Sequence, residues 1–307
     1  MEIIHNIERT STEKCVATIG MFDGVHLGHQ ALLDELKEIA RLNGLKSGVI
    51  TFSTHPQQVL RPDSGLRMIV TLEDRLKYLD EMGVDKVFVM DFNADLAKLE
   101  SKAFMSLLQS KCGVEILVMG FNHRFGCNKD EFFEDYEAHG AEIGMKVLRA
   151  SEYRGEYSPV SSSLIRKMIE EGRVDLAERY LGRPFELAGV VVHGFKNGRK
   201  LGYPTANIDV SPNLIMPHRG VYAVRVDLEN GEKYCGMANI GVRPTVVKGG
   251  ERTFEVNIFD FDGDLYGQRL NVRFVKFMRS EMKMSSLDEL KERLASDKQA
   301  CINVLGC

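Results

Sequence analysis

The chain has 307 residues, 44% of them hydrophobic and 27% charged, which is the composition of a globular protein long enough for two domains. Its formal net charge of −4 provides no broad positive field for nucleic acid, and no run approaches the roughly 18 apolar residues of a membrane-spanning helix. The six cysteines form neither a CxxC pair nor a metal-ligand spacing. Scattered cysteines of this kind are typical of a reducing compartment, so we expect a cytoplasmic enzyme that binds neither nucleic acid nor membranes.

Short apolar runs alternate with amphipathic stretches in the first half. Strands are predicted at residues 15–19, 47–52, 86–90, 115–119 and 146–148. Helices are predicted between them, at about 28–41, 73–82 and 101–109. Asn43-Gly44 provides the stop signal for the first helix. This alternation predicts a parallel sheet covered by helices, with ligands bound outside the carboxyl ends of the strands.

The segment from Gly20 to His29 follows the first predicted strand and begins a helix. The first turn of a helix presents unpaired N–H groups and the positive end of the dipole, so it favours phosphate. Gly24 and Gly28 allow a close approach to the backbone, and His26 and His29 share one helix face. The two histidines are either ordinary exposed or capping residues, or donors to phosphate oxygens as negative charge develops. The HxGH pattern at a strand-to-helix turn favours the second interpretation.

A second polar cluster, Ser161-Ser162-Ser163, is typical of a helix N-cap. Arg166 lies one turn into that helix, where a cation opposes the helix dipole. Such a cation favours a bound anion, and the polyphosphate of ATP is a candidate because a guanidinium fork matches phosphate oxygens.

The pattern changes after about Gly182, where strands follow strands. They are predicted at residues 187–193, 221–228, 232–238, 253–259 and 269–277, with a final helix near 287–294. This order predicts a small antiparallel β-barrel with a terminal helix. We therefore expect two domains, residues 1–182 and 183–307.

A glycine-rich basic loop opens the second domain. Its glycines and cations, which suit phosphate groups, are Gly194, Gly198, Arg199, Lys200 and Gly202. Thr205 and Asn207 follow on one side of an extended chain, and two neutral oxygens suit Mg²⁺, which keeps water and phosphate ligands. The sequence has no GxxxxGK[ST] motif and so no P-loop. From glycine and charge alone, a surface hairpin with solvated charges would explain the loop equally well.

Glu255 is the candidate catalytic base of this half. Strand alternation places Phe254, Val256 and Ile258 on the core face, and Glu255 with Asn257 on the other. Glu255 therefore faces either a ligand at the barrel mouth or solvent.

The motifs of the first half together resemble a known family. HxGH and the later Ser-Ser-x-x-Ile-Arg are similar to the nucleotidyltransferase superfamily, and segments 51–56, 83–85, 91–93 and 120–126 resemble the adenylyltransferase module of bacterial bifunctional riboflavin kinase/FAD synthetases. The resemblance covers residues 14–180 and implies a Rossmann-like domain in which His26, His29 and Arg166 stabilise ATP phosphates. The further ATP contacts that it implies are Gly20, Phe22, Asp23, Gly24, His55, Ser162 and Ser163. The flavin contacts that it implies are Asn122, Arg124 and Phe125.

Several positions depart from that family pattern. Thr54 stands where proline is common, Ser163 where threonine is common and His123 where an aromatic residue is common. Cys127-Asn128-Lys129 replaces a more glycine-rich basic loop. These departures concern the flavin contacts more than the nucleotide contacts.

The second half resembles riboflavin kinases. The string Gly-Arg-x-Leu-Gly-Tyr-Pro-Thr-Ala-Asn at 198–207 is similar to their signature, and segments 220–223, 238–245, 264–267 and 279–281 extend the match over residues 185–300. The resemblance implies a six-stranded barrel in which the basic loop binds ATP, Thr205 and Asn207 hold Mg²⁺, and Glu255 accepts the proton of the riboflavin 5′-hydroxyl. It also implies flavin contacts by Arg279 and Glu281, while Asn257 stands where the family often has histidine.

Together the two resemblances predict ATP-dependent phosphorylation of riboflavin to FMN, followed by adenylylation of FMN to FAD with release of pyrophosphate. Three alternatives stay open: a riboflavin kinase with an impaired adenylyltransferase domain, a flavin-binding regulator, and a nucleotidyltransferase for another phosphorylated acceptor such as a pantetheine or glycerol compound. The retained Glu255, HxGH and Arg166 oppose a regulator, and the kinase-like barrel opposes another acceptor.

Overall fold

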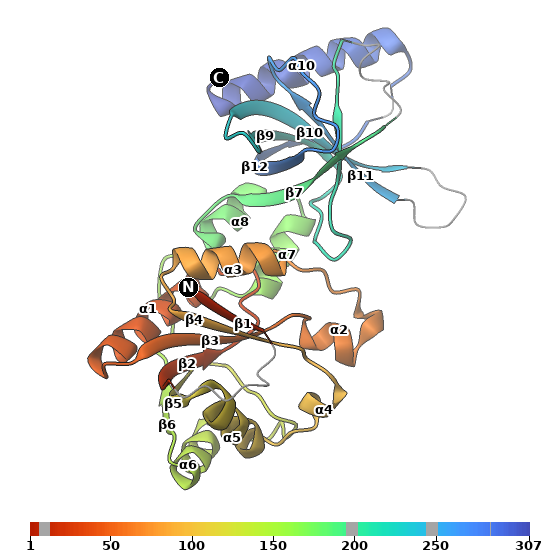
Figure 1. Ribbon diagram of the computed structural model, residues 1–307. Coiled ribbons are helices and arrows are strands. Elements are labelled where there is room, and N and C mark those ends of the chain that lie inside the picture. Colours follow the sequence, from red (N-terminus) through yellow and green to blue (C-terminus); the bar gives the residue numbers. More distant parts are fainter. Residues whose placement is uncertain (6–12, 195–201, 244–250, 283) are drawn as a thin grey trace. The chain divides into compact units, whose positions relative to one another are not determined.

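The computed structural model describes residues 1–5, 13–194, 202–243, 251–282 and 284–307 (Figure 1). The chain divides into two compact units, Met1–Ser161 and Ser162–Cys307. Within the described ranges, none of the helices combines the length and the apolar character that spanning a membrane requires.

The first unit is built on a six-stranded sheet. Its strands are β1 (Glu2–His5), β2 (Cys15–Ile19), β3 (Lys46–Phe52), β4 (Lys86–Met90), β5 (Val114–Met119) and β6 (Lys146–Arg149). They are all parallel, in the order β1-β4-β3-β2-β5-β6. Every residue of β2 and β4 is buried, as expected for central strands covered on both faces. The predicted parallel sheet is confirmed, and the sequence analysis missed only the short edge strand β1 among these six.

Helices cover both faces of this sheet. They are α1 (Leu27–Leu42), α2 (Pro56–Leu60), α3 (Leu72–Glu81), α4 (Ala94–Ala97), α5 (Ser101–Cys112) and α6 (Phe133–Ile143). Figure 1 shows α1 and α3 on one side of the sheet and α5 and α6 on the other. Alternate residues of β2, Cys15, Ala17 and Ile19, join one buried cluster with Phe104 and Leu108 of α5. This cluster forms the core between the sheet and α5.

The second unit contains a closed barrel. Its strands are β7 (Phe185–Val192), β8 (Ala206–Asp209), β9 (Gly220–Leu228), β10 (Lys233–Arg243), β11 (Glu251–Ile258) and β12 (Arg269–Arg279). They pair antiparallel in the order β10-β11-β8-β7-β12-β9, and β9 closes onto β10. The aromatic rings of Phe185, Tyr222 and Phe274 are fully buried in its core. The predicted barrel is confirmed, with the short strand β8 added.

Helix α10 (Leu287–Leu305) packs on β9, β10 and β12 and is longer than the sequence predicted. A disulfide between Cys235 of β10 and Cys307 joins the end of this helix segment to the barrel, a pairing that the cysteine spacing did not predict. Helices α7 (Ser162–Glu170) and α8 (Val174–Leu181) also belong to the second unit by packing. Both helices precede residue 182, so the two structural units divide earlier in the chain than the predicted domain boundary. The boundary at residue 182 stays a prediction of where the two activities divide.

Candidate active sites

The turn between β2 and α1 has an unusual backbone. Phe22, Gly24 and Val25 have φ angles of 50°, 82° and 38°. These angles lie in the left-handed region, which residues other than glycine rarely adopt. Phe22 and Val25 are each 1% exposed, and the Val25 N–H donates to the Phe22 carbonyl. Such strain persists only where the surroundings hold it, and it concentrates at functional sites. The turn therefore presents the N-terminus of α1 in one fixed conformation.

Two stacked imidazoles lie at that N-terminus. The ring centroids of His26 and His29 are 3.6 Å apart with 11° between the planes. The His29 amide N–H donates to Nδ1 of His26 at 3.3 Å, which makes His26 the N-cap of α1. Because Nδ1 accepts, the neutral His26 ring carries its proton on Nε2. The structure thus brings both predicted histidines together as one stacked pair at a helix N-terminus.

Two buried side chains of opposite charge, Asp23 and Arg75, hold the backbone around the turn. The carboxylate of Asp23, 1% exposed, accepts the N–H groups of Ile69 and Val70 at 3.0–3.3 Å. The guanidinium of Arg75 donates to the carbonyls of Met21 (2.6 Å) and Phe52 (2.7 Å), which follow β2 and end β3. Burial lowers the pKa of Arg75 to about 10, and the charge of Asp23 opposes this shift.

Arg75 was not predicted from the sequence. Its signal was a cation within the apolar face of α3, where Arg75, Tyr78 and Leu79 are all buried at helical spacing. The Asp23 carboxylate accepts hydrogen bonds from backbone amides of the protein, and the backbone around it forms the turn before α1.

His55 has a similar capping position. It is the N-cap of α2, where its Nδ1 accepts the Gln57 N–H at 3.0 Å. Pro56 occupies the first turn of this helix. The side chain follows β3, so it belongs to the same edge of the sheet as the HxGH turn.

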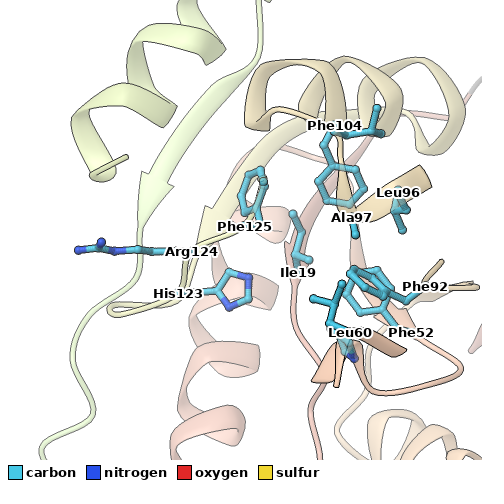
Figure 2. Close-up of a pocket in the computed structure, with 13 residues that line it drawn as sticks. Ile19, Phe52, Leu60, Phe92, Leu96, Ala97, Phe104, His123, Arg124 and Phe125 are labelled. Atoms are coloured by element: carbon cyan, nitrogen blue, oxygen red, sulfur yellow. The ribbon is translucent and has the colours of Figure 1, made fainter. Parts of the chain in front are cut away.

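An apolar cavity of about 230 Å³ lies at the carboxyl ends of the strands (Figure 2). Its walls come from Ile19 at the end of β2, Phe52 at the end of β3 and Phe92 after β4. The segment 123–126 after β5 completes it, together with residues of α2, α4 and α5. The lining residues are Ile19, Phe52, Pro56, Leu60, Phe92, Leu96, Ala97, Leu99, Phe104, His123, Arg124, Phe125 and Gly126.

The three predicted flavin contacts differ in their relation to this cavity. Phe125 packs edge-on against Phe104 and contacts Tyr136, with ring centroids 5.6 and 4.7 Å apart. Arg124 lines the cavity, but its guanidinium lies over the Phe132 ring at 4.9 Å and points away from the other labelled side chains in Figure 2. Asn122 is exposed and does not line the cavity.

Ser162 and Ser163 form the first turn of α7, as the N-cap pattern predicted, and Arg166 lies one turn further along this helix. These residues belong to the second unit.

A row of polar side chains crosses the barrel. Asn207 of β8 pairs with Glu255 of β11, and Glu255 pairs with Asn239 of β10, so the three side chains share one face. The Thr205 hydroxyl donates to Oε2 of Glu255 at 3.3 Å. Hydroxyl, amide and carboxylate oxygens are the ligand types that Mg²⁺ accepts, so the predicted set fits that ion. Among the described residues, no group of three His, Cys, Asp or Glu side chains could hold a metal.

Neighbouring residues position this row. Asn257, 6% exposed, donates its amide to the Pro204 carbonyl at 2.7 Å, which holds the segment before Thr205. Gly194 lies so close to the Asn207 amide that any Cβ at residue 194 would overlap it. Gly202 has a φ angle of 82°. The predicted contacts Gly198, Arg199 and Lys200 lie outside the described residues.

A second cavity, of about 410 Å³, adjoins this row. It is lined by Val191, Pro204, Thr205, Ala206, Val256, Ile258, Phe261, Asp262, Gly263, Asp264, Leu265 and Tyr266. It has apolar walls and two carboxylates, and Thr205 connects it to Glu255.

Arg279 and Glu281, at and beyond the end of β12, both lie against other segments of the second unit. The Arg279 guanidinium donates to both carboxylate oxygens of Asp297 in α10, with Nη2 2.5 Å from Oδ2. A Cβ built on Gly241 would lie 2.7 Å from the Glu281 carboxylate, so Glu281 lies against β10.

Comparison with known proteins matches the whole chain. The family model for FAD synthetase matches residues 8–164, and that for riboflavin kinase matches residues 181–305. The bifunctional riboflavin kinase/FMN adenylyltransferase of Escherichia coli K12 is 39% identical over 305 residues, covering 99% of this chain and 96% of the relative. The protein of the same name from Bacillus subtilis 168 is 35% identical, covering 97% and 95%. A crystal structure described as a macrolide-efflux protein from Streptococcus pneumoniae has a TM-score of 0.88 at 32% identity, with 99% of each chain covered.

Proposed function

The chain belongs to the family of bifunctional riboflavin kinases/FMN adenylyltransferases, which turn riboflavin into FMN and FMN into FAD with ATP, and from this premise we propose which of its residues perform each reaction. Both halves match their own family models, and full-length relatives carry both names. This favours the bifunctional protein over the kinase-only, regulator and other-acceptor alternatives. Because both reactions consume ATP, we propose that the protein works in the cytoplasm.

The kinase reaction is proposed to take place at the polar row of the barrel. The observation that carries this proposal is the Glu255 carboxylate, held by the Thr205 hydroxyl and opposite Asn207 across the strand pair. Glu255 accepts the proton of the riboflavin 5′-hydroxyl as that oxygen attacks the γ-phosphorus of ATP. Thr205 and Asn207 would hold Mg²⁺ through their side-chain oxygens, and the ion would neutralise charge on the phosphates.

The second cavity suits the adenosine part of ATP better than its phosphates. The carboxylates of Asp262 and Asp264 disfavour phosphate, while the apolar walls suit a planar base. The phosphates then extend past Thr205 towards the basic loop, for which Gly194, Gly198, Arg199, Lys200 and Gly202 stay the proposed contacts.

Adenylylation is proposed to take place at the HxGH turn. The FMN phosphate attacks the α-phosphorus of ATP and pyrophosphate leaves, so no nucleophilic side chain is needed. Nε2–H of His26 and the His29 ring are the donors for the phosphate oxygens. The contacts of Gly20, Phe22, Asp23 and Gly24 with ATP rest on the family motif. Asp23 and Arg75 keep the backbone of this turn in place.

The assignments of His55, Ser162, Ser163 and Arg166 to ATP rest on the family motifs. For Arg279 and Glu281, whose side chains contact Asp297 and Gly241, we propose that they shape the flavin site of the barrel from its edge.

The 230 Å³ cavity is the proposed site of the flavin ring of FMN. Pockets that enclose whole drug-sized ligands are about 300–1,000 Å³, so this cavity suits the ring system alone. Its walls are largely apolar and aromatic, with Phe125 among them, and it opens at the sheet edge that carries the HxGH turn. The polar chain of FMN, with Asn122 and Arg124 nearby, would extend from the cavity towards solvent.

Chromatography of the products formed from riboflavin, ATP and Mg²⁺ tests these roles. The wild type should yield FAD, Glu255→Gln should lose both FMN and FAD by about 10²–10⁴-fold, and His29→Ala should accumulate FMN. A wild type that stops at FMN would support the kinase-only alternative. Flavin binding without any product would support the regulator instead.

A further inference from the structure

One buried polar atom in the first cavity has no partner. Nε2 of His123 is shielded from solvent and makes no hydrogen bond within the described part of the chain. Buried side-chain polar atoms are bonded in the large majority of cases, so an exception calls for a ligand, an ordered water or a functional explanation. His123 lines the cavity proposed for the flavin ring, which supplies a candidate ligand.

The ring of His123 is held in a defined orientation. Its backbone N–H donates to the Gly120 carbonyl at 2.9 Å in the turn after β5, and its ring lies 6.2 Å from that of Phe125. Figure 2 shows the imidazole directed towards the space that Ile19 and Leu60 border, while the guanidinium of Arg124 points the other way. His123 therefore contributes a positioned polar atom to an otherwise apolar wall.

The chemistry of this atom restricts what it can bind. Burial lowers the pKa of His123 to about 4, so the ring is neutral at pH 7. A neutral imidazole has one donor and one acceptor nitrogen and pairs well with an uncharged carbonyl, ring nitrogen or N–H group. The flavin ring carries such atoms on its pyrimidine ring and at N5 of the central ring next to it, whereas its dimethylbenzene side is apolar.

We propose that His123 determines specificity in the adenylyltransferase reaction by forming a hydrogen bond from Nε2 to the pyrimidine side of the flavin ring of FMN. The dimethylbenzene side then packs among the aromatic and aliphatic walls, including Phe52, Phe92 and Leu96. This proposal rests on the proposed flavin site. It concerns a residue that stands where an aromatic side chain is common in the family, so the contact would be particular to chains with histidine here.

Two variants separate the hydrogen bond from packing. His123→Phe keeps a planar ring and removes both nitrogens, and His123→Gln restores a neutral donor and acceptor near the position of Nε2. We expect His123→Phe to raise the Kd for FMN and the KM of adenylylation about tenfold, with kcat nearly unchanged, and His123→Gln to recover part of the loss. Riboflavin phosphorylation by both variants should equal the wild-type rate, and an unchanged thermal unfolding transition of the first unit shows that this unit is folded.

Altered flavins make the test specific. The Kd is measured for FMN, for its 2-thio, 4-thio and 3-methyl analogues, and for an analogue without the two ring methyl groups. The wild type should discriminate against at least one pyrimidine-side analogue, and His123→Phe should remove that discrimination while leaving the response to the missing methyl groups intact. An equal loss of affinity for every flavin, or no loss, would overturn the proposal.

Ala97→Phe tests the flavin site itself, because the larger side chain fills the cavity. If Ala97→Phe binds FMN as the wild type does, the flavin ring lies elsewhere and the proposed site fails. If Ala97→Phe blocks binding while His123→Phe does not change discrimination, only the role of His123 fails.

Discussion

The hydroxyl of Thr205 and the carboxylate of Glu255 are joined by a hydrogen bond of 3.3 Å, although fifty residues separate them in the chain. The pairing of β8 with β11 brings them together, because Asn207 lies opposite Glu255 in the ladder. A proposed metal ligand and a proposed base are therefore positioned by one strand pair.

Replacing Thr205 with valine should impair the kinase and spare the adenylyltransferase. The variant keeps the shape of the side chain and loses its oxygen, so the Mg²⁺ concentration for half-maximal FMN formation should rise roughly tenfold or more. Thr205→Ser keeps the hydroxyl and should stay close to the wild type. The measurement is the rate of FMN formation against Mg²⁺ concentration, with FAD formation from supplied FMN as the control. Equal Mg²⁺ dependence of valine and serine variants would exclude Thr205 as a ligand.

Gly194→Ala should also reduce FMN formation. A Cβ at residue 194 would overlap the Asn207 amide, which would have to leave its place opposite Glu255. Gly231→Ala is the matched control, since its φ of 86° makes it strained but nothing lies within 4 Å of the added atom. The control should lose about 1 kcal/mol of stability and retain its kinase rate. If both variants phosphorylate riboflavin equally well, the close contact of Gly194 with Asn207 has no role in the kinase.

Arg75→Met should destabilise the first unit and abolish FAD formation. It removes the hydrogen bonds that Arg75 donates to the Met21 and Phe52 carbonyls. A buried acceptor left without its donor costs about 1–3 kcal/mol. Thermal unfolding of the variant, followed together with both activities, measures the effect. We expect a lower transition for the first unit and a retained riboflavin kinase activity. An unchanged transition would show that Arg75 does not hold the turn.

The order of elements was predictable from the sequence because periodicity changes where the architecture changes. The buried runs of β2 to β5 and the amphipathic α1 and α3 are local patterns, and so is the switch to strands after Gly182. Strand β8, Ala206–Asp209, was not predicted, since it is short and its sequence, Ala-Asn-Ile-Asp, has no apolar run.

The sequence indicated which residues belong to the site better than it indicated which residues they contact. Motifs indicated His26, His29 and Glu255, whose positions follow from a helix start and a strand. The contacts of Asp23 with Ile69 and of Arg279 with Asp297 join distant segments, so no local spacing could reveal them. The role of Arg75 depends on two carbonyls at strand ends, which only the folded sheet brings within its reach.

Thiol labelling should distinguish one cysteine from the others. Burial raises the pKa of Cys15, Cys112 and Cys301 to about 12, so at pH 8 only about one thiol in 10⁴ at each site is the reactive thiolate. Cys127 is exposed. Iodoacetamide at pH 8 should label Cys127 alone in the native oxidised protein, and Cys235 and Cys307 as well after reduction. Peptide mass analysis checks this, and rapid native labelling of Cys15 or Cys112 would contradict the burial of these thiols.

Because Arg279 contacts Asp297 of α10, it acts on the flavin either directly or by holding this helix in place, and variants of the two residues distinguish these roles. Asp297 is 5% exposed and accepts hydrogen bonds from Nε and Nη2 of Arg279, so Asp297→Ala should destabilise the second unit by about 3–5 kcal/mol. Arg293→Ala is the control, because this more exposed guanidinium lies 3.4 Å from the same carboxylate and should contribute at most about 1 kcal/mol. The measurements are the unfolding transition of the second unit and the KM for riboflavin. If Arg279→Lys raises the KM for riboflavin without lowering the unfolding transition, Arg279 contacts the flavin. If Arg279→Lys and Asp297→Ala each raise this KM and also lower the transition, Arg279 and Asp297 act by anchoring α10 to the barrel.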